Sequence, residues 1–183
     1  YKVLPYLAET LERGPKKMVL RDKIFNPFQK PDMGGKPYCV IVCDNATLER
    51  MIGLEYYQNA TVSIVVDHHA SNEGYGDVNW TEVSEACAEN VYHMLDPQCL
   101  RKAAEAEEHP TAADYIYLGI AHDTGGMARA KKSTLLALVD LMSMGVDHGE
   151  IMKTMHSDTL DTLNKRADII RSARRAMDGK VAY

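Results

Sequence analysis

The chain has 183 residues, of which 45% are hydrophobic and 26% are charged, and its formal net charge is −5. The length fits one domain of ordinary size, and the composition supplies enough apolar residues for a sizeable core. Binding of long nucleic acid depends on many Lys and Arg side chains against phosphates, so the negative balance argues against such a partner. It leaves open a short anionic substrate that is held by a metal ion and a few local cations.

No apolar run approaches the roughly 18 residues of a membrane helix, and no basic start with an apolar segment after it indicates a signal peptide. We therefore expect a cytoplasmic protein without a membrane partner. The four cysteines are scattered without a CxxC pair. We interpret them as small buried apolar residues in a reducing compartment, rather than as disulfides or zinc ligands.

The first part of the chain alternates between predicted helices and strands. Helical spacing of apolar residues predicts a helix over residues 2–14, and a Pro- and Gly-rich loop covers residues 26–37. A strand over 38–44, a helix over 47–60 and a strand over 61–67 follow, before a turn-rich segment over 70–80. Both strands are continuous apolar runs, which are typical of parallel sheets covered by helices on both faces.

The second part of the chain is predicted to be mainly helical. Helices are expected over residues 81–95, 111–122, 132–144, 147–156 and 159–177. The first of these would bury a stripe with Val83, Cys87 and Val91, and Asp147 would cap the fourth. The order of elements predicts an α/β fold with a mainly parallel, Rossmann-like sheet flanked by helices. The last residues, "DGKVAY", indicate a turn that enters a new strand, so a second domain is expected after this one.

Acidic and imidazole side chains follow the two predicted strands. Asp44 ends the first strand, and Asp67, His68 and His69 end the second. Ligands bind outside the carboxyl ends of the strands in open parallel sheets. Asp123 precedes a Thr-Gly-Gly loop that could return its carboxylate to the same edge. Carboxylates gathered there would repel one another without bound cations, and mixed oxygen and imidazole ligands suit Mn, Fe, Co or Zn.

The two adjacent histidines are expected to differ in role, because neighbouring side chains near a strand end point to opposite sides. One could ligate a metal ion, while the other could bind or protonate a phosphate oxygen. Asp67 would share the side of His69 and could orient a ring by hydrogen bonding. Simpler interpretations stay open for single residues: Asp44 could be a helix N-cap, and Asp123 could be a turn residue.

Three ordered motifs resemble those of the DHH phosphoesterase superfamily. "VCDNATLERM" is similar to its second motif, "VVDHHASN" to its signature and "GIAHDTGGM" to its fourth motif, with Glu89 in its usual place in the helix after the signature. The likeness runs from about residue 38 to 183. It points to the branch of bifunctional oligoribonucleases and pAp phosphatases, or to the related cyclic-dinucleotide phosphodiesterases. It implies a DHH domain over residues 1–176 and the start of a linker to a DHHA1 domain over residues 177–183.

The resemblance also implies a role for each matching residue. Asp44 would bridge two manganese ions, with Mg²⁺ or Co²⁺ as alternatives. His68 would ligate one of the ions, and Asp123 would complete the set. His69 would contact the scissile phosphate as a catalytic residue, and Asp67 would support the imidazoles. The residues that would line the substrate are Asn72, Thr124 and Gly125.

Two features of the superfamily are not found in the sequence. The first motif is a His-x-x-Pro-Asp-Gly-Asp loop, and Asp32, which follows Pro31, cannot replace it because it lies only 12 residues before Asp44 (44 − 32) and lacks the His and the second Asp. We expect this motif upstream of Tyr1. The DHHA1 domain, which holds the nucleobase in relatives, is expected after residue 183.

The resulting hypothesis is a metal-dependent phosphoesterase in which water activated by two metal ions attacks phosphorus in line. The expected substrates are short oligonucleotides, a 3′-phosphorylated adenosine bisphosphate, or linear or cyclic dinucleotides, and a homodimer is possible. Arg129 could help to hold phosphates or could simply be exposed before a helix.

Two other functions stay open for this chain. A degenerate nucleotide-binding module without metals would lack the first motif upstream of Tyr1. A pyrophosphate hydrolase would keep the same ligands. No GxGxxG sequence follows a strand, which argues against a dinucleotide-dependent oxidoreductase.

Overall fold

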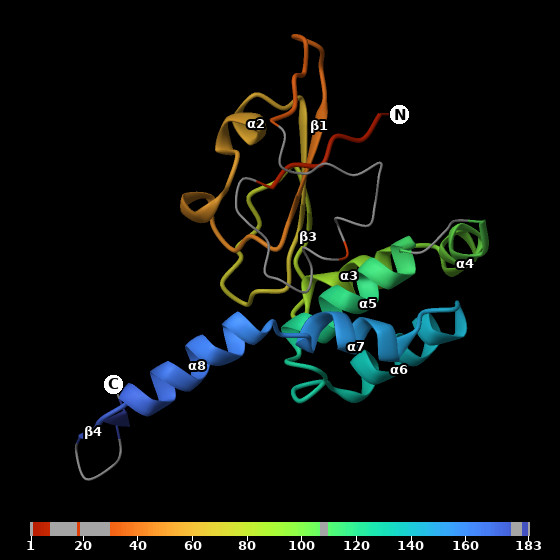
Figure 1. The fold of residues 1–183 in the computed structure, drawn as a ribbon. Helices are drawn as coiled ribbons and strands as arrows, with labels where there is room; N and C mark the ends of the chain where they lie inside the picture. Colours follow the sequence, from red (N-terminus) through yellow and green to blue (C-terminus); the bar gives the residue numbers. More distant parts are fainter. Residues whose placement is uncertain (1, 8–17, 19–29, 107–109, 177–180, 183) are drawn as a thin grey trace.

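A three-stranded parallel sheet is formed by the first half of the described chain (Figure 1). In this computed structural model, the described residues are 2–7, 18, 30–106, 110–176 and 181–182. Strand β1 (Cys39–Cys43) pairs with β2 (Val62–Val66), and β2 pairs with β3 (Val78–Trp80). The last residues of the three strands lie in register with one another. The segments that follow β1 and β2 therefore start from the same edge of the sheet, and the predicted α/β class is confirmed.

The central strand is the buried one. Val65 and Val66 of β2 are 0% and 3% exposed, and β-branched side chains such as these suit a pleated, buried strand. Ile41 of β1, in contrast, is 62% exposed. The expectation that both strands are buried on both faces thus holds for the carboxyl-terminal part of β2, whereas Val62 at its start is 42% exposed and one face of β1 is exposed along the strand.

The connection between β1 and β2 differs from the predicted single helix over residues 47–60. It contains a 3-10 turn, η1 (Leu48–Arg50), and a short helix, α2 (Leu54–Gln58). Gly53 separates them with a left-handed φ of 76°, which a continuous right-handed helix cannot contain. Strand β3 lies in the segment predicted as turns, since its three exposed residues form a strand only through pairing with β2.

The helices follow in the order α3 (Cys87–Met94), α4 (Pro97–Ala106), α5 (Ala112–Asp123), α6 (Lys132–Ser143), α7 (His148–His156) and α8 (Leu160–Ser172). Helix α3 begins at Cys87 rather than at residue 81, so Val83 is 65% exposed and does not belong to its buried stripe. Helix α4 was not predicted. Residues 2–7 are not helical, and most of the predicted first helix lies outside the described residues.

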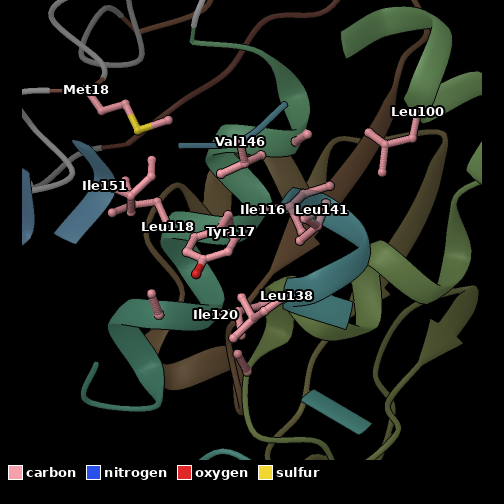
Figure 2. Packing of buried hydrophobic residues seen from close by; sticks show 13 residues of the cluster. Met18, Leu100, Ile116, Tyr117, Leu118, Ile120, Leu138, Leu141, Val146 and Ile151 are labelled. Atoms are coloured by element: carbon pink, nitrogen blue, oxygen red, sulfur yellow. The ribbon is translucent and has the colours of Figure 1, made fainter. Parts of the chain in front are cut away.

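The hydrophobic core lies between the helices (Figure 2). Tyr117 and Ile120 of α5 and Leu141 of α6 are at most 1% exposed. Burial of one such apolar side chain stabilises the fold by about 1.5–3 kcal/mol. A capping box at Thr111 defines the start of α5: Asp114 donates its N–H to the Thr111 side chain and accepts the Thr111 N–H at 2.7 Å. The core thus holds α5 rigidly, with Asp123 as its last residue.

The C-terminal helix α8 projects away from the other helices and buries none of its residues (Figure 1). After it, β4 (Arg175–Ala176) pairs antiparallel with β5 (Val181–Ala182), which is the strand expected in the last residues. Among the helices of the described residues, α8 included, none is long and apolar enough to cross a membrane.

The cysteines do not match the interpretation that all four are buried. All four are free thiols. Cys87 is buried, whereas Cys39, Cys43 and Cys99 are exposed. The two in β1 are exposed because both lie on the exposed face of that strand, together with Ile41.

Candidate metal centre

Three segments bring acidic and imidazole side chains to one place. Asp44 directly follows β1, His68 lies just after β2, and Asp123 ends α5. His68 Nε2 lies 3.4 Å from Asp44 Oδ1 and 3.9 Å from Asp123 Oδ2. Potential ligand atoms of Asp44, Asp67, His68 and His69 all lie within 4.8 Å of one another. The structure therefore gathers the three residues predicted as metal ligands, together with the Asp67–His69 pair.

The hydrogen bond of His68 fixes which of its ring nitrogens is free. Nδ1 lies 3.2 Å from the backbone carbonyl oxygen of Ser84, and the side chain is 17% exposed. A carbonyl can only accept, so Nδ1 carries the proton. Nε2 is consequently the ring nitrogen that faces the carboxylates of Asp44 and Asp123. This is the tautomer of a metal-ligating histidine whose other nitrogen donates to a backbone carbonyl.

Asp67 and His69 form a second unit beside His68. Asp67 is fully buried, and its carboxylate accepts hydrogen bonds from His69 Nδ1 at 2.8 Å and Asn72 Nδ2 at 2.7 Å. Burial acts to raise the pKa of Asp67, but the hydrogen bonds from His69, Asn72 and the His68 backbone outweigh it and lower the pKa. The hydrogen bond to Asp67 in turn raises the pKa of His69, against the opposing effect of desolvation. Asp67 therefore stays ionised and holds the His69 ring.

The two histidine rings lie side by side rather than on opposite sides. Their centroids are 4.5 Å apart, with planes tilted by 60°. The expected alternation does not apply because β2 ends at Val66, before either histidine. The His69 side chain is 45% exposed, so His69 is the more accessible of the two.

The electrostatics of the cluster suit a divalent cation. Burial and the charge of Asp123 raise the pKa of Asp44, and the nearby histidines offset this only in part. Two carboxylates facing one imidazole nitrogen repel each other, and a cation between them would remove the repulsion. The donor set of two carboxylates and one imidazole nitrogen fits Mn, Fe, Co or Zn. The side chains therefore can hold a metal ion.

Both carboxylates occupy locally unfavourable positions. Asp44 has a left-handed φ of 57°, a region that costs L-residues roughly 1–2 kcal/mol, although Asp tolerates it better than most. Asp123 places a negative charge at the C-terminal end of α5, where the helix dipole disfavours it. Local preferences therefore do not explain these positions, and such strain persists only where the surrounding structure fixes it.

Asn72 and Thr124, which were predicted to line the substrate, have their polar atoms engaged within the protein. Thr124 is fully buried, and its hydroxyl donates to the carbonyl of Ile120 at 2.7 Å and accepts the N–H of Met127 at 3.1 Å. Asn72 donates to the Asp67 carboxylate at 2.7 Å. The two side chains thus hold the loops around the site.

Gly125 and Arg129, the other two predicted substrate residues, lie at the exposed edge of the site. Gly125 has a left-handed φ of 63°. The Arg129 guanidinium lies against it, 3.1 Å from where a Cβ would stand, and donates to the backbone carbonyl of Asp123. His122 also lies close, with Nδ1 3.8 Å from Asp123 Oδ1.

Asn90 of α3 also supports the site, although it was not predicted from the sequence. This residue is 2% exposed, and its Nδ2 donates to the carbonyl of Asp67 at 2.8 Å and to the carbonyl of Glu82 at 2.7 Å. It thereby ties the end of β2 to the loop that carries the Ser84 carbonyl. The sequence of α3 held a signal for such a role, because two polar residues, Glu89 and Asn90, share its buried face with Cys87.

Comparisons with known proteins found relatives of this chain in sequence and in fold. No protein-family model matches the chain. Over 148 residues it is 26% identical to the bifunctional oligoribonuclease and PAP phosphatase NrnA of Bacillus subtilis (strain 168), which covers 76% of this chain and 44% of that protein. Over 135 residues it is 28% identical to the probable bifunctional oligoribonuclease and PAP phosphatase NrnA of Streptococcus mutans serotype c, covering 70% of this chain and 41% of that protein. The chain thus spans less than half the length of these relatives.

A solved structure supports the fold. The crystal structure of an exopolyphosphatase-related protein from Bacteroides fragilis matches with a TM-score of 0.64 and 18% identity, over 75% of this chain and 41% of that chain. The same fold, the related sequences and the three ordered motifs agree with one another. The related sequences and the shared fold therefore support the resemblance of this chain to the DHH phosphoesterase superfamily.

Proposed function

We propose that the protein is a manganese-dependent phosphoesterase that hydrolyses short oligonucleotides, pAp, or linear or cyclic dinucleotides to nucleoside monophosphates. The observation that carries the proposal is the convergence of Asp44 Oδ1 and Asp123 Oδ2 on His68 Nε2, at 3.4 and 3.9 Å. Three separate segments supply these atoms, and the Ser84 carbonyl holds His68 in the ligating tautomer. Two carboxylates and an imidazole nitrogen suit a divalent ion, and such an ion can activate water for attack on phosphorus.

The relatives support the substrate class. Both NrnA proteins carry names that describe an oligoribonuclease and a PAP phosphatase, so they act on short or monomeric nucleotides. The net charge of −5 also suits a short substrate, because long nucleic acid would need many cationic contacts. Since the chain spans less than half of each relative, the substrates of the whole protein are part of this proposal.

The residues of the site would have different roles in metal binding and in phosphate binding. Asp44, His68 and Asp123 would hold the metal ions, of which we propose two. Bound divalent ions would lower the pKa of water and neutralise charge that develops on phosphoryl oxygens. His69, with Nδ1 held by Asp67, would donate a hydrogen bond from Nε2 to a phosphoryl oxygen, and its raised pKa favours the protonated, donating form.

Arg129 and Gly125 would contribute to holding the phosphate at the exposed edge of the site. One guanidinium nitrogen of Arg129 already donates to the Asp123 carbonyl, which orients the group. Other N–H groups of the guanidinium stay available as donors, because it carries five. Gly125 adds no side chain that would fill the space beside it.

The test is an assay of the purified protein with manganese against a diribonucleotide, pAp, cyclic di-AMP and pyrophosphate. We expect monophosphate release from at least one nucleotide, and its loss to background in His68→Ala, together with loss of manganese binding. His93→Ala is the matched control, because His93 is an exposed histidine whose contacts are with Glu89, at 3.9 Å, and with the edge of the Tyr92 ring. Near-normal turnover of His68→Ala would contradict the site.

Two other outcomes would support the alternative functions. Turnover of pyrophosphate alone would favour a pyrophosphate hydrolase. Nucleotide binding without turnover, and without dependence on manganese, would favour a binding module.

A further inference from the structure

The turn after β1 holds Asp44 in its left-handed conformation from both sides. On one side, the Asp44 N–H donates to the carbonyl of Val66 in β2 at 3.0 Å. On the other side, the backbone carbonyl of the next residue, Asn45, accepts two hydrogen bonds. They come from the Tyr75 hydroxyl at 2.7 Å and from Asn72 Nδ2 at 3.2 Å. The backbone around Asp44 is therefore fixed by residues of a different segment.

Tyr75 is bound to Asn45 twice. Its hydroxyl donates to the Asn45 carbonyl and also accepts a hydrogen bond from Asn45 Nδ2 at 2.9 Å, while the same amide donates to the carbonyl of Thr47 at 2.7 Å. Tyr75 is itself anchored by α2, because the Tyr57 hydroxyl donates to its carbonyl and the two rings meet edge to face at 5.8 Å. A half-buried, anchored tyrosine thus uses its hydroxyl entirely on the turn that follows Asp44.

Asn72 links this turn to the other half of the site. Its Nδ2 donates to the Asp67 carboxylate at 2.7 Å as well as to the Asn45 carbonyl, and its Oδ1 accepts the N–H of Gly74 at 2.8 Å. The polar atoms of this amide are therefore used, and they connect the segment after β1 to the segment after β2. One side chain sets the spacing between the two segments that supply Asp44 and His68.

We propose that Tyr75 and Asn72 are positioning residues of the metal centre, which hold the strained Asp44 turn so that its carboxylate faces His68. Non-glycine residues adopt positive φ rarely, and such residues cluster at functional sites, where the surrounding structure holds them in place. Without these hydrogen bonds the turn would relax and aim the carboxylate elsewhere. The inference rests on the proposed function, since it assumes that Asp44 is a metal ligand.

The test is Tyr75→Phe in the purified protein, because this change removes only the hydroxyl. We expect the dissociation constant for manganese, measured by calorimetric titration with manganese chloride, to rise by about 10- to 100-fold, as is usual when a group that orients metal ligands is lost. The manganese concentration for half-maximal activity should rise with it, while saturating manganese should restore most of kcat. A merely structural role would lower the melting temperature without changing the manganese affinity of the folded protein.

Tyr38→Phe is the matched control. The Tyr38 hydroxyl also donates to a backbone carbonyl, that of Tyr56, at 2.7 Å, but Tyr38 precedes β1 whereas Asp44 follows it. We expect this variant to bind manganese as the wild type does. If circular dichroism shows that Tyr75→Phe does not fold, Asn45→Ala serves instead. It removes the amide that donates to Tyr75 and should weaken manganese binding less strongly.

The possible failures can be told apart. Manganese binding by the wild type with unchanged affinity in Tyr75→Phe, or in Asn45→Ala where that variant replaces it, would overturn this inference alone. A weakened affinity in Tyr38→Phe that equals the weakening in Tyr75→Phe would overturn it too. A wild type that neither binds manganese nor turns over a nucleotide would overturn the proposed function and this inference with it.

Discussion

The core between the helices, called here the helical layer, and the carboxyl edge of the sheet are stabilised in different ways. In the layer, residues such as Tyr117, Ile120 and Leu141 are buried without charge and stabilise the fold by removing apolar surface from water. At the edge, Asp44 and Asp123 are 50% and 33% exposed and face the same imidazole. The helical layer therefore stabilises the fold. The carboxyl edge instead tolerates local strain and charge repulsion in order to hold its side chains in one arrangement, as functional sites commonly do.

The carboxyl edge has a buried, hydrogen-bonded part around Asp67 and a partly exposed part with Asp44 and Asp123. Asp67 is fully buried with its carboxylate hydrogen-bonded to His69 and Asn72, and its carbonyl is bound by Asn90. Among the described residues, no buried side-chain nitrogen or oxygen lacks a hydrogen-bond partner. The part around Asp67 therefore resembles the core, because its buried polar atoms all have hydrogen-bond partners. It orients the exposed side chains beside it.

Among the variants that keep all three proposed metal ligands, His69→Ala should have the largest effect on activity. Loss of a group that donates to a phosphoryl oxygen is expected to lower kcat by about 10²- to 10⁴-fold. Manganese affinity should change much less, because the proposed ligands Asp44, His68 and Asp123 remain. Steady-state kinetics at saturating manganese and calorimetric titration measure the two effects. An equal loss of both would mean that the roles of His68 and His69 are exchanged.

Leu141→Ala should have the largest effect in the helical layer. Leu141 is fully buried, and the change should lower the free energy of unfolding by about 2–5 kcal/mol, measured by urea denaturation. The folded fraction should keep the manganese affinity of the wild type. Leu136→Ala on the same helix is the control, because Leu136 is 60% exposed and its loss should change stability by no more than about 0.5 kcal/mol. A change in manganese affinity of folded Leu141→Ala would show that the two regions are coupled.

Asp44→Asn should have the smallest effect on the free energy of unfolding, and in the metal-free protein the change should be stabilising. The change removes repulsion from Asp123, and Asn tolerates the left-handed φ at least as well as Asp. Because the side chain is half exposed, we expect a gain of only about 0.5–1 kcal/mol in urea denaturation with EDTA. With excess manganese the wild type should become more stable than Asp44→Asn, because manganese binding stabilises only the wild type appreciably.

Asp161→Asn is the control for this change. Asp161 is an exposed carboxylate on α8 whose partner is Lys165, at 2.9 Å. Its loss should lower stability by a few tenths of a kcal/mol with or without manganese. A metal-free Asp44→Asn protein that is less stable than the wild type would contradict the view that the edge carries repulsion.

The sequence alone determined the α/β class, the strands β1 and β2 and the gathering of Asp44, His68 and Asp123. Continuous apolar runs and the rule that parallel strands end at one edge are properties that a chain carries locally. Helix α5 was also predictable, since Thr111 and the apolar residues after it mark its start and its buried faces.

Only the tertiary structure decided how the site is held. The pairing of β3, the placement of both histidine rings on one side, the tautomer of His68 and the hydrogen bonds of Asn90 and Tyr75 all depend on contacts between segments far apart in the chain. A hydrogen bond of this kind leaves no periodic pattern in the sequence, because its donor and acceptor meet only after the elements that carry them have packed.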